Sequence, residues 1–291
     1  MTSQPLVSVL MTSYNREKYI ADAIESVLAS SYTNFELIIV DDTSRDGTVE
    51  IARKYERLDS RIRVYVNETN LGDYPNRNRA ASYATGKYLK YLDSDDLIYP
   101  HGLEVMVRAM EKFPDAGMGT PYHREQDTKP YPYLVDPESA YKEYFLKEDF
   151  LQTGPSGVIM RRSSFEQAGG FSGKRFIGDF EMWLTLAARE PVVKFQSALF
   201  WWRQHEGQEY KHGQTMEGYY TLIYVTMRNL LMSPGCPLNE QDRNFILSKL
   251  KRRQSRFVLG LMVKKLKFSE AKFVMEKCAL PLGDILKYSF S

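Results

Sequence analysis

This 291-residue sequence has little of what several specialised protein classes depend on. Its two cysteines, Cys236 and Cys278, lie far apart and outside any Cys-x-x-Cys spacing, so neither a disulfide framework nor a structural zinc site is expected. No window approaches about 18 continuous apolar residues, and residues 1–5 lack the charged and apolar regions of a signal peptide. We therefore expect a cytoplasmic protein of a reducing compartment that neither spans a membrane nor is secreted.

The sequence also lacks a large net charge and the glycine-rich loops of common nucleotide sites. A formal net charge of +2, with no run that mixes aromatic and basic residues, gives no reason to expect nucleic acid as a partner. No Gly-x-Gly-x-x-Gly follows the first apolar run, and no Gly-Lys-Ser/Thr stands in a suitable place. A dinucleotide site and an ATPase phosphate loop are therefore disfavoured.

What the chain does contain is a regular alternation of apolar runs and amphipathic segments in its first third. The runs that fit buried strands are 6–11, 35–40, 62–66 and 88–92. The segments between them have helical spacing, with Asn15 a candidate N-cap for the first helix and Gly86 a stop for the third. This alternation predicts a doubly wound α/β sheet with short crossovers.

Polar and acidic residues follow three of these predicted strands. They are Thr12-Ser13-Tyr14, Asp41-Asp42 and Asp93-Ser94-Asp95-Asp96. Because ligands of such sheets bind beyond the carboxyl ends of the strands, we expect the three clusters to line one crevice. Carboxylates this close repel one another, so the last cluster needs a cation unless it is only an acidic turn. Oxygen ligands suit Mg²⁺ or Mn²⁺, and the implied ligand is a metal-bound nucleotide.

The middle of the chain is less regular. A helix is predicted over 103–110, and 115–149 is expected to be a long excursion over the face of the sheet that shapes a second ligand's pocket. The other predicted elements are strands at 154–160 and 192–200, a helix at 163–168 stopped by a glycine pair, and a helix that opens near 178. Asp179 stands where a carboxylate would cap that last helix, so capping and catalysis both remain open for it.

The composition changes beyond residue 207. Segments 216–232 and 239–267 are helical in pattern, and the stretch 249–268 is rich in lysine and arginine with apolar residues on the opposite face. A basic amphipathic helix of this kind can lie on an anionic membrane surface. The alternative is a solvated helix face that packs on the rest of the protein.

The motifs of the first hundred residues resemble those of the family 2 glycosyltransferases, which have the GT-A fold. The matching stretches are Val7-Ser8-Val9, Tyr14-Asn15, Ile38-Ile39-Val40-Asp41-Asp42, Asp46-Gly47-Thr48, Asn70-x-Gly72, Arg77-Asn78, Gly86-x-Tyr88 and Leu92-Asp93-Ser94-Asp95-Asp96. Later matches are Gly169-Gly170-Phe171, the stretch 178–184 and Arg203-x-His205. Gly178 departs from the pattern, since a glutamate is common there. The segment from 206 onward carries none of the shared motifs.

The resemblance implies a GT-A type, Rossmann-like, mixed but mostly parallel sheet flanked by helices, followed by a helical C-terminal extension. Residues 1–100 would form the nucleotide-sugar-binding half, 101–206 the acceptor-binding and catalytic half, and 207–291 the basic extension. It also implies roles for individual residues. Thr12 and Tyr14 would form the nucleoside wall, Asp41 would accept from the base, Arg77 and Asp93 would reach the nucleotide, Asp95 and His205 would hold the metal, and Asp179 would be the general base.

The function implied is that of an inverting glycosyltransferase with Mn²⁺ or Mg²⁺ as cofactor. A UDP-sugar would be the donor, and a saccharide or lipid-linked saccharide of bacterial surface polysaccharide or glycolipid assembly the acceptor. With 249–268 on lipid, the enzyme would lie at the inner face of the cell membrane. Two alternatives are a catalytically silent sugar- or nucleotide-binding domain and a nucleotidyltransferase, although the latter would want a glycine-rich loop after the first strand. No oligomeric state is predicted.

Overall fold

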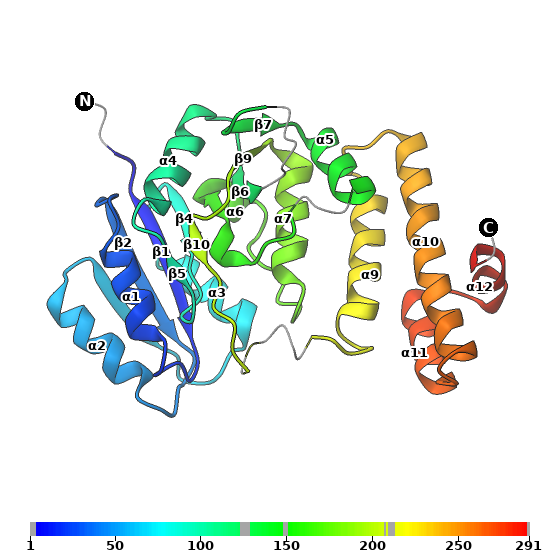
Figure 1. The fold of residues 1–291 in the computed structure, drawn as a ribbon, viewed down its shortest axis with the longest axis horizontal. Helices are drawn as coiled ribbons and strands as arrows, with labels where there is room; N and C mark the ends of the chain where they lie inside the picture. The colour runs from blue at the N-terminus through cyan, green and yellow to red at the C-terminus, as the bar shows by residue number, and fades with distance from the viewer. Residues whose placement is uncertain (1–3, 123–128, 148–150, 207, 209–212, 290–291) are drawn as a thin grey trace. The chain divides into compact units, whose positions relative to one another are not determined.

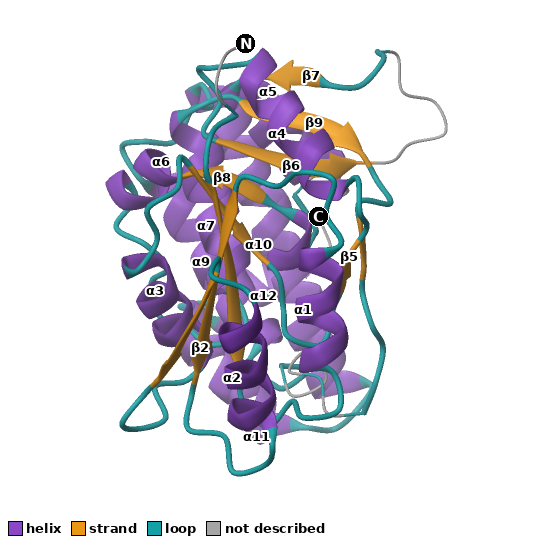
Figure 2. Cartoon of the chain, turned by 90° about the vertical axis from the view of Figure 1, so that its left-hand side faces the viewer, coloured by secondary structure: helices purple, strands orange, loops and turns teal. Residues whose placement is uncertain are grey.

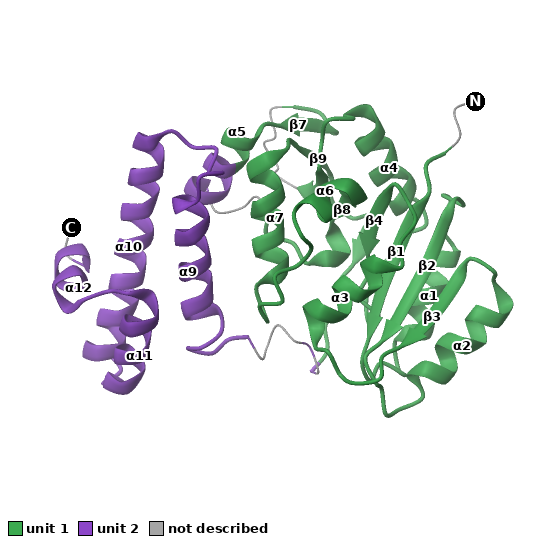
Figure 3. Ribbon diagram, turned by 180° about the vertical axis from the view of Figure 1, so that it is seen from behind, with its two compact units in different colours: residues 1–140, 149–205 green, residues 141–148, 206–291 purple. Residues whose placement is uncertain are grey.

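The structure is a computed structural model that describes residues 4–122, 129–147, 151–206, 208 and 213–289 (Figure 1). The chain divides into two compact units (Figure 3). The first comprises residues 1–140 and 149–205, and the second comprises 141–148 and 206–291. Both predicted halves of the first two hundred residues contribute strands to one sheet.

Among the described residues, eight strands form the central sheet, in the order β3-β2-β1-β4-β8-β6-β9-β7. Their bounds are β1 Val7–Ser13, β2 Phe35–Asp41, β3 Ile62–Val66, β4 Tyr88–Tyr91, β6 Met118–Tyr122, β7 Tyr133–Val135, β8 Ile159–Arg161 and β9 Val192–Gln196. The first four strands are parallel, as is β6 with β9, whereas β8 runs antiparallel to β4 and β6, and β7 to β9. This mixed, mostly parallel sheet confirms the predicted fold class. A two-stranded ribbon pairs β5, Leu97–Ile98, with β10, Phe200–Trp201.

Helices cover both faces of this sheet (Figure 2). They are α1 Ile20–Leu28, α2 Thr48–Leu58, α3 Asp73–Ser82, α4 Gly102–Lys112, α6 Arg162–Gln167 and α7 Gly178–Arg189. The apolar stripes of α1, α2 and α4 pack on one face in a buried core with side chains of β1 and β2. Helices α3, α6 and α7 lie on the other face. Because all four N-terminal strands are parallel, the polar residues after β1, β2 and β4 reach the same edge.

Two local predictions were wrong. Helix α1 begins after Tyr19, and Asn15 instead has a left-handed backbone, with φ of 52°. The Asn15 side chain accepts a hydrogen bond from the backbone of Arg45 at 2.8 Å, so it ties two loops together instead of capping a helix. Gly86 does not stop α3, which ends earlier, at Ser82. It is needed because β1 passes close by, and an added Cβ would lie 2.6 Å from the Ser8 amide nitrogen.

The predicted excursion at 115–149 was also wrong, because part of it joins the sheet. Residues 118–122 form β6 in the interior of the sheet and 133–135 form its edge strand β7. Short helices follow, α5 at Pro137–Lys142 and a π-helical turn at Glu143–Lys147. Residues 123–128 and 148–150 lie outside the described part. The glycine and proline of β6 weaken its strand signal, since both are rare in strands.

Two further strands are shorter than predicted. The run 154–160 begins with a 3₁₀ turn at Pro155–Gly157, so its strand is only β8. The run 192–200 breaks after Gln196, and its remainder enters the ribbon as β10. Ala198, in that break, has a left-handed φ of 62°, which a continuous strand cannot contain. The break returns the chain toward the acidic residues that follow β4.

The second unit is helical. Its described helices include α9 Tyr219–Met232, α10 Glu240–Val263, α11 Phe268–Cys278 and α12 Leu282–Ser289. Asn239 caps α10 by accepting a hydrogen bond from the Asp242 amide at 2.9 Å. The helix predicted over 239–267 ends earlier, at Val263. The two later helices, α11 and α12, were not predicted. No helix in the described part is long and apolar enough to cross a membrane.

Helix α10 uses its apolar side inside the second unit. Val258 and Leu261 are buried in a core shared with α9, α11 and α12. Ile246, further up the helix, is also buried. Because these apolar side chains are buried, the stretch 249–268 exposes much less apolar surface beside its lysines and arginines than the sequence pattern suggests.

The close approach of Gly86 to β1 gives a test of the sheet. Gly86→Ala should lower the free energy of unfolding by about 1–3 kcal/mol, the cost of overpacking, because Ser8 backbone atoms cannot move away. Chemical denaturation measures this change. Gly154→Ala is the matched control, since an added Cβ there meets nothing within 4 Å. Equal stability of the two variants would contradict the packing argument.

Candidate active site

The end of β2 carries two buried carboxylates with different tasks. Asp41 accepts hydrogen bonds from the Ser13 hydroxyl at 2.8 Å and from the Ser44 amide at 2.7 Å, and the Ser44 hydroxyl also donates to it. Asp42 accepts from the backbone amides of Leu71 and Gly72 and from Asn67. Asp42 thus fixes the loop before α3, while Asp41 joins the end of β1 to the turn that carries Ser44.

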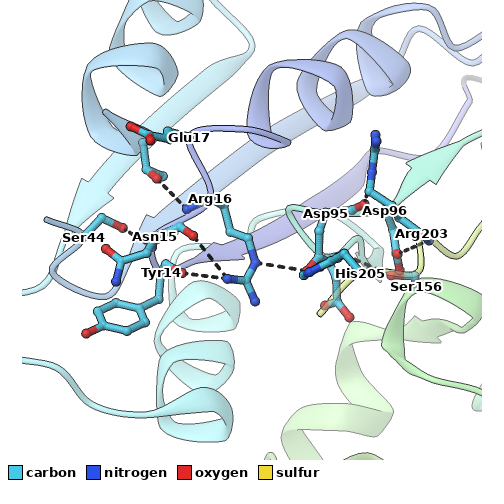
Figure 4. A network of polar contacts seen from close by, with 12 residues as sticks. Tyr14, Asn15, Arg16, Glu17, Ser44, Asp95, Asp96, Ser156, Arg203 and His205 are labelled. Atoms are coloured by element: carbon cyan, nitrogen blue, oxygen red, sulfur yellow. Dashed lines mark hydrogen bonds and ion pairs between the residues drawn. The ribbon is translucent and has the colours of Figure 1, made fainter. Parts of the chain in front are cut away.

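The turn after β4 brings Asp95 to an arginine and a histidine (Figure 4). The Asp95 Oδ2 atom lies 3.0 Å from Arg16 Nε and 2.9 Å from His205 Nε2. Arg203 Nε donates to the Asp95 backbone carbonyl at 2.9 Å. Because Arg16 follows β1 and the other two residues follow β10, two distant segments meet at this one aspartate.

Asp93 and Asp96 point to different partners. Asp93 Oδ1 accepts from Arg77 Nη1 at 2.7 Å, and Arg77 Nε also donates to Asp73 at 2.7 Å. Asp96 accepts from the Arg203 amide at 3.1 Å. Burial, and then the neighbouring Asp93, raise the pKa of the Asp96 carboxyl. The acidic turn was expected to need a cation, and arginine side chains supply at least part of that positive charge.

A buried lysine and a serine lie behind the turn. Lys90 is fully buried on β4, and its ammonium donates to the carbonyls of Tyr91 and Ser156. The Ser156 hydroxyl accepts from the Asp93 amide at 3.0 Å. Burial lowers the pKa of Lys90 to about 7, although Asp93 and Asp96 favour its charged form. These contacts join the 3₁₀ turn before β8 to the end of β4 and so hold the acidic turn in place.

Asp179 lies in the first turn of α7, whose N-cap is Ile177, so the interpretation of Asp179 as the cap was wrong. Its Oδ1 accepts from the Tyr74 hydroxyl at 2.9 Å and from the Phe180 amide at 2.7 Å. Burial raises the pKa of Asp179 to about 6, against the effect of these two donors and of Arg77. A carboxylate that releases its proton near neutral pH is suited to general base chemistry.

The departure at Gly178 has a structural reason. An added Cβ at Gly178 would lie 2.7 Å from the ring of Tyr74. A glutamate here would therefore displace the tyrosine that holds Asp179. In this chain the glycine of α7 leaves the space that the Tyr74 ring of α3 occupies.

The structure brings together some of the predicted site residues. Asp95 meets His205, and Asp93 meets Arg77. Thr12 is half-buried on β1, and Tyr14, just beyond it, is 43% exposed. The sequence analysis missed Arg16, Tyr74, Ser156 and Arg203 as site residues. Two of these residues had a visible signal: Arg203 belongs to the Arg203-x-His205 motif, and Arg16 is a cation in a polar turn at the same sheet edge as the acids.

The donor set fits a divalent cation only as a partial site. Within the described residues, no group of three or more histidine, cysteine or acidic side chains could hold a metal. Adjacent ligands of an octahedral cation at about 2.1 Å lie about 3 Å apart, and the 2.9 Å between Asp95 Oδ2 and His205 Nε2 matches this spacing. Mg²⁺ and Mn²⁺ commonly take their other ligands from water and substrate phosphates. Asp95 and His205 would therefore hold the cation together with a diphosphate.

Comparison with known proteins gives a consistent family. The profile described as "Glycosyl transferase family 2" matches residues 8–169. The putative teichuronic acid biosynthesis glycosyltransferase TuaG of Bacillus subtilis is 38% identical over 187 residues, 63% of this chain and 72% of TuaG. The putative glycosyltransferase EpsE of the same organism is 45% identical over 113 residues, only 38% of this chain and 41% of EpsE.

A third relative has a more specific name. It is UDP-Glc:alpha-D-GlcNAc-diphosphoundecaprenol beta-1,3-glucosyltransferase WfgD of Escherichia coli, 42% identical over 107 residues. The match covers 37% of this chain and 42% of WfgD. The aligned stretch is thus less than half of either protein.

Solved structures share the fold. Residues 1–349 of S. aureus TarS, in complex with UDP-GlcNAc, superpose with a TM-score of 0.72 at 21% identity, over 97% of this chain and 81% of that one. The mannosyltransferase PcManGT of Pyrobaculum calidifontis, in complex with GDP-Man and Mn²⁺, gives a TM-score of 0.66 at 15% identity, over 99% and 80%. At these identities the likeness concerns architecture alone.

The raised pKa of Asp179 makes a prediction about stability. Its carboxyl pKa rises from the ordinary 3.8 to about 6 on folding, so its stabilising contribution is present below about pH 4 and lost as the pH passes 6. Asp179→Asn should therefore raise the unfolding temperature at pH 8, and the difference should vanish near pH 4. Thermal unfolding followed by circular dichroism measures both.

Asp46→Asn is the contrasting control. Hydrogen bonds from Thr48 and Glu17 outweigh burial and lower the pKa of Asp46. Removing this carboxylate should therefore reduce stability at pH 8. If both variants shift in the same direction, the assignment of a destabilising buried charge to Asp179 is wrong.

Proposed function

Because the chain belongs to glycosyl transferase family 2, we propose that it is an inverting glycosyltransferase that takes its sugar from a metal-bound UDP-sugar. The observation that carries this proposal is a set of three acidic groups, of which one ends β2, one follows β4 and the third is held by Tyr74 of α3. These are the hydrogen-bonded Asp41, the Asp95 and His205 pair, and Asp179 with its raised pKa. They would serve as a nucleoside site, a metal site and a general base.

The nucleoside would bind beyond β1 and β2. Asp41 already accepts two hydrogen bonds at Oδ2 and one at Oδ1 from described residues. Since a carboxylate has about four acceptor positions, Oδ1 can accept one further donor, such as the N3-H of uracil. Thr12 and the exposed Tyr14 would form the wall of this pocket.

The diphosphate would lie at the acidic turn. Asp95 and His205 would hold Mn²⁺ or Mg²⁺ there, and the cation would act as a Lewis acid that stabilises charge on the departing diphosphate. Asp93 would orient the ribose side, with Arg77 holding its carboxylate in position. A direct contact of Arg77 with the diphosphate stays a prediction, and its burial between Asp73 and Asp93 favours the positioning role.

Asp179 would be the general base. The two hydrogen bonds described for it end on Oδ1, so Oδ2 can accept the proton of the acceptor hydroxyl. The acceptor oxygen then bonds to the anomeric carbon while the bond from that carbon to the diphosphate breaks. The leaving nucleotide keeps the electron pair, and the configuration at the anomeric carbon inverts. Tyr74 keeps the base in place throughout.

The acceptor would be a saccharide or lipid-linked saccharide of bacterial surface polysaccharide or glycolipid assembly. The names of two relatives support this choice, one placed in teichuronic acid biosynthesis and one acting on a diphosphoundecaprenol-linked sugar. An acceptor with a polyprenyl chain resides in a bilayer. The enzyme would then work at the inner face of the cell membrane.

The stretch 249–268 would provide peripheral contact with anionic lipid, mainly through its end. The turn between α10 and α11 exposes Val263, Leu266 and Phe268 at 66%, 70% and 60%. Between them stand three exposed lysines, of which Lys267 pairs with Glu270 at 2.6 Å. Apolar side chains and lysines mixed in this way favour the boundary between headgroups and acyl chains.

The role of Asp179 predicts a specific loss. Asp179→Asn should reduce the turnover number of sugar transfer by at least about 100-fold, the scale of general base catalysis, while UDP binding by calorimetry is unchanged. In the wild type the rate should rise with pH through about 6, because the base must be deprotonated. Normal turnover in the variant would remove Asp179 from this role.

Tyr74→Phe separates positioning from chemistry. The Tyr74 hydroxyl lowers the pKa of Asp179 by donating to it. Without that donor, the acidic limb of the pH–rate profile should move to higher pH, and activity at high pH should largely return. An unmoved limb would mean that another group controls the profile.

The membrane contact predicts binding that depends on lipid charge. The protein should sediment with anionic phosphatidylglycerol vesicles and much less with phosphatidylcholine. Lys264→Gln combined with Lys265→Gln should weaken binding by about 30-fold, since each lysine near such a surface contributes about 1 kcal/mol. Leu266→Ser with Phe268→Ser should also weaken it. Leu58→Ser is the control, as this leucine of α2 is 73% exposed, and equal binding by all variants would refute the assignment.

A further inference from the structure

We propose that Arg16 couples the metal and the donor by exchanging its carboxylate partner, Asp95, for the diphosphate of the incoming nucleotide. This inference rests on the proposed function, because it assigns a residue to the same site. It concerns a side chain that none of the family motifs quoted above includes.

Arg16 is held at its backbone and extends across the site. Its amide donates to the Thr48 hydroxyl at 2.7 Å, and the preceding Asn15 amide donates to the Ser44 hydroxyl at 2.8 Å. Its Nη1 donates to the carbonyls of Tyr14 and Asn15 at 3.1 and 3.2 Å. The guanidinium therefore lies between the turn that carries Tyr14 and the Asp95 carboxylate (Figure 4).

The oxygen that Arg16 contacts is the one that a cation needs. Arg16 Nε and His205 Nε2 both lie at about hydrogen-bond distance from Asp95 Oδ2, at 3.0 and 2.9 Å. A divalent cation at this oxygen would stand next to a guanidinium of like charge, in a place where Asp95 is only 13% exposed. Repulsion between like charges is stronger where water is thin. Arg16 thus opposes metal binding for as long as no anion is present.

A nucleoside diphosphate supplies that anion in the right place. Its base would lie at Asp41 and its phosphates at Asp95, so the linking diphosphate passes the region that Arg16 spans. A planar guanidinium can bind phosphate oxygens with two parallel hydrogen bonds, a geometry that suits a diphosphate. The Arg16 side chain is 25% exposed and can turn without unpacking a core. Metal and diphosphate would then each favour the binding of the other.

Arg16→Gln should change the affinities for Mn²⁺ and UDP in opposite directions, whereas a loss of structure would lower both. Arg16→Gln should bind Mn²⁺ alone about 5- to 10-fold more tightly, because the competing charge is gone. In the presence of Mn²⁺ it should bind UDP about 10- to 100-fold more weakly, because a charge-assisted hydrogen bond is lost. Uridine, which has no phosphate, should bind as it does to the wild type. The affinities of Arg16→Lys should lie between those of the wild type and of Arg16→Gln, since lysine keeps the positive charge but lacks the planar guanidinium.

Electron paramagnetic resonance of free Mn²⁺ measures the first affinity, and calorimetry measures the affinities for UDP and uridine. Lys18→Gln removes an exposed positive charge two residues away and should match the wild type in all three. Asp95→Ala should abolish the Mn²⁺-dependent part of UDP binding. Thermal unfolding of each variant, together with uridine binding, reports that it is folded.

The outcomes distinguish this inference from the proposed function. If Arg16→Gln leaves the Mn²⁺ affinity or the UDP affinity unchanged, or lowers both, Arg16 is not the coupling residue. In that case wild-type binding of UDP with Mn²⁺ still supports the donor site. If the wild type itself binds no UDP with Mn²⁺, the proposed donor and the role of Arg16 are both overturned.

Discussion

The arrangement of the site depends on one buried arginine, Arg77, and the two carboxylates that it joins. Arg77 contacts Asp73 on its own helix and Asp93 at the end of β4, each at 2.7 Å, and its side chain is 9% exposed. Removing one partner of such a buried pair costs about 3–5 kcal/mol, because a charge is left without compensation. Helix α3 is therefore fixed against the acidic turn.

This ion pair also positions the proposed base, through the residue next to Asp73. Tyr74 lies in the first turn of α3 and its hydroxyl holds Asp179 of α7. The same helix thus contacts Asp93 of the acidic turn through Arg77 and Asp179 through Tyr74. In the proposed reaction, this one helix would set the distance between the donor site and the base. Orientation of this kind is a large part of what an enzyme can contribute to a rate.

Charge is distributed in this site so that each acid has a separate environment. Asp41 accepts from hydroxyls and an amide, Asp93 from an arginine, and Asp179 from a tyrosine and an amide in a buried place. Burial around Asp179 raises the pKa of its carboxyl to about 6, a range in which a base works near neutral pH. At the shared Asp95 oxygen, contacted by both Arg16 and His205, a further cation would compete with protein donors.

Local pattern was a sufficient guide where neighbouring residues decide the structure. The strand 62–66 and the helix of α4 lie where their apolar spacing predicts them, because each buries a face defined by its own sequence. Strand β6 escaped prediction, since Gly119 is required by the ring of Phe195 on the paired strand β9, not by its neighbours in sequence. Asn15 and Gly86 were misassigned for the same reason, because the contacts that decide their roles come from segments distant along the chain.

The sequence by itself therefore determined the α/β class, the order of the first strands and the set of acids at their ends, because parallel strands bring their carboxyl ends to one edge. Only the tertiary structure decided which acid meets which cation. Asp95 lies against Arg16 and His205, which are 79 and 110 residues away, and Asp179 against Tyr74, 105 residues away. Such pairings are fixed by the packing of whole helices and strands, and no local pattern in the chain records them.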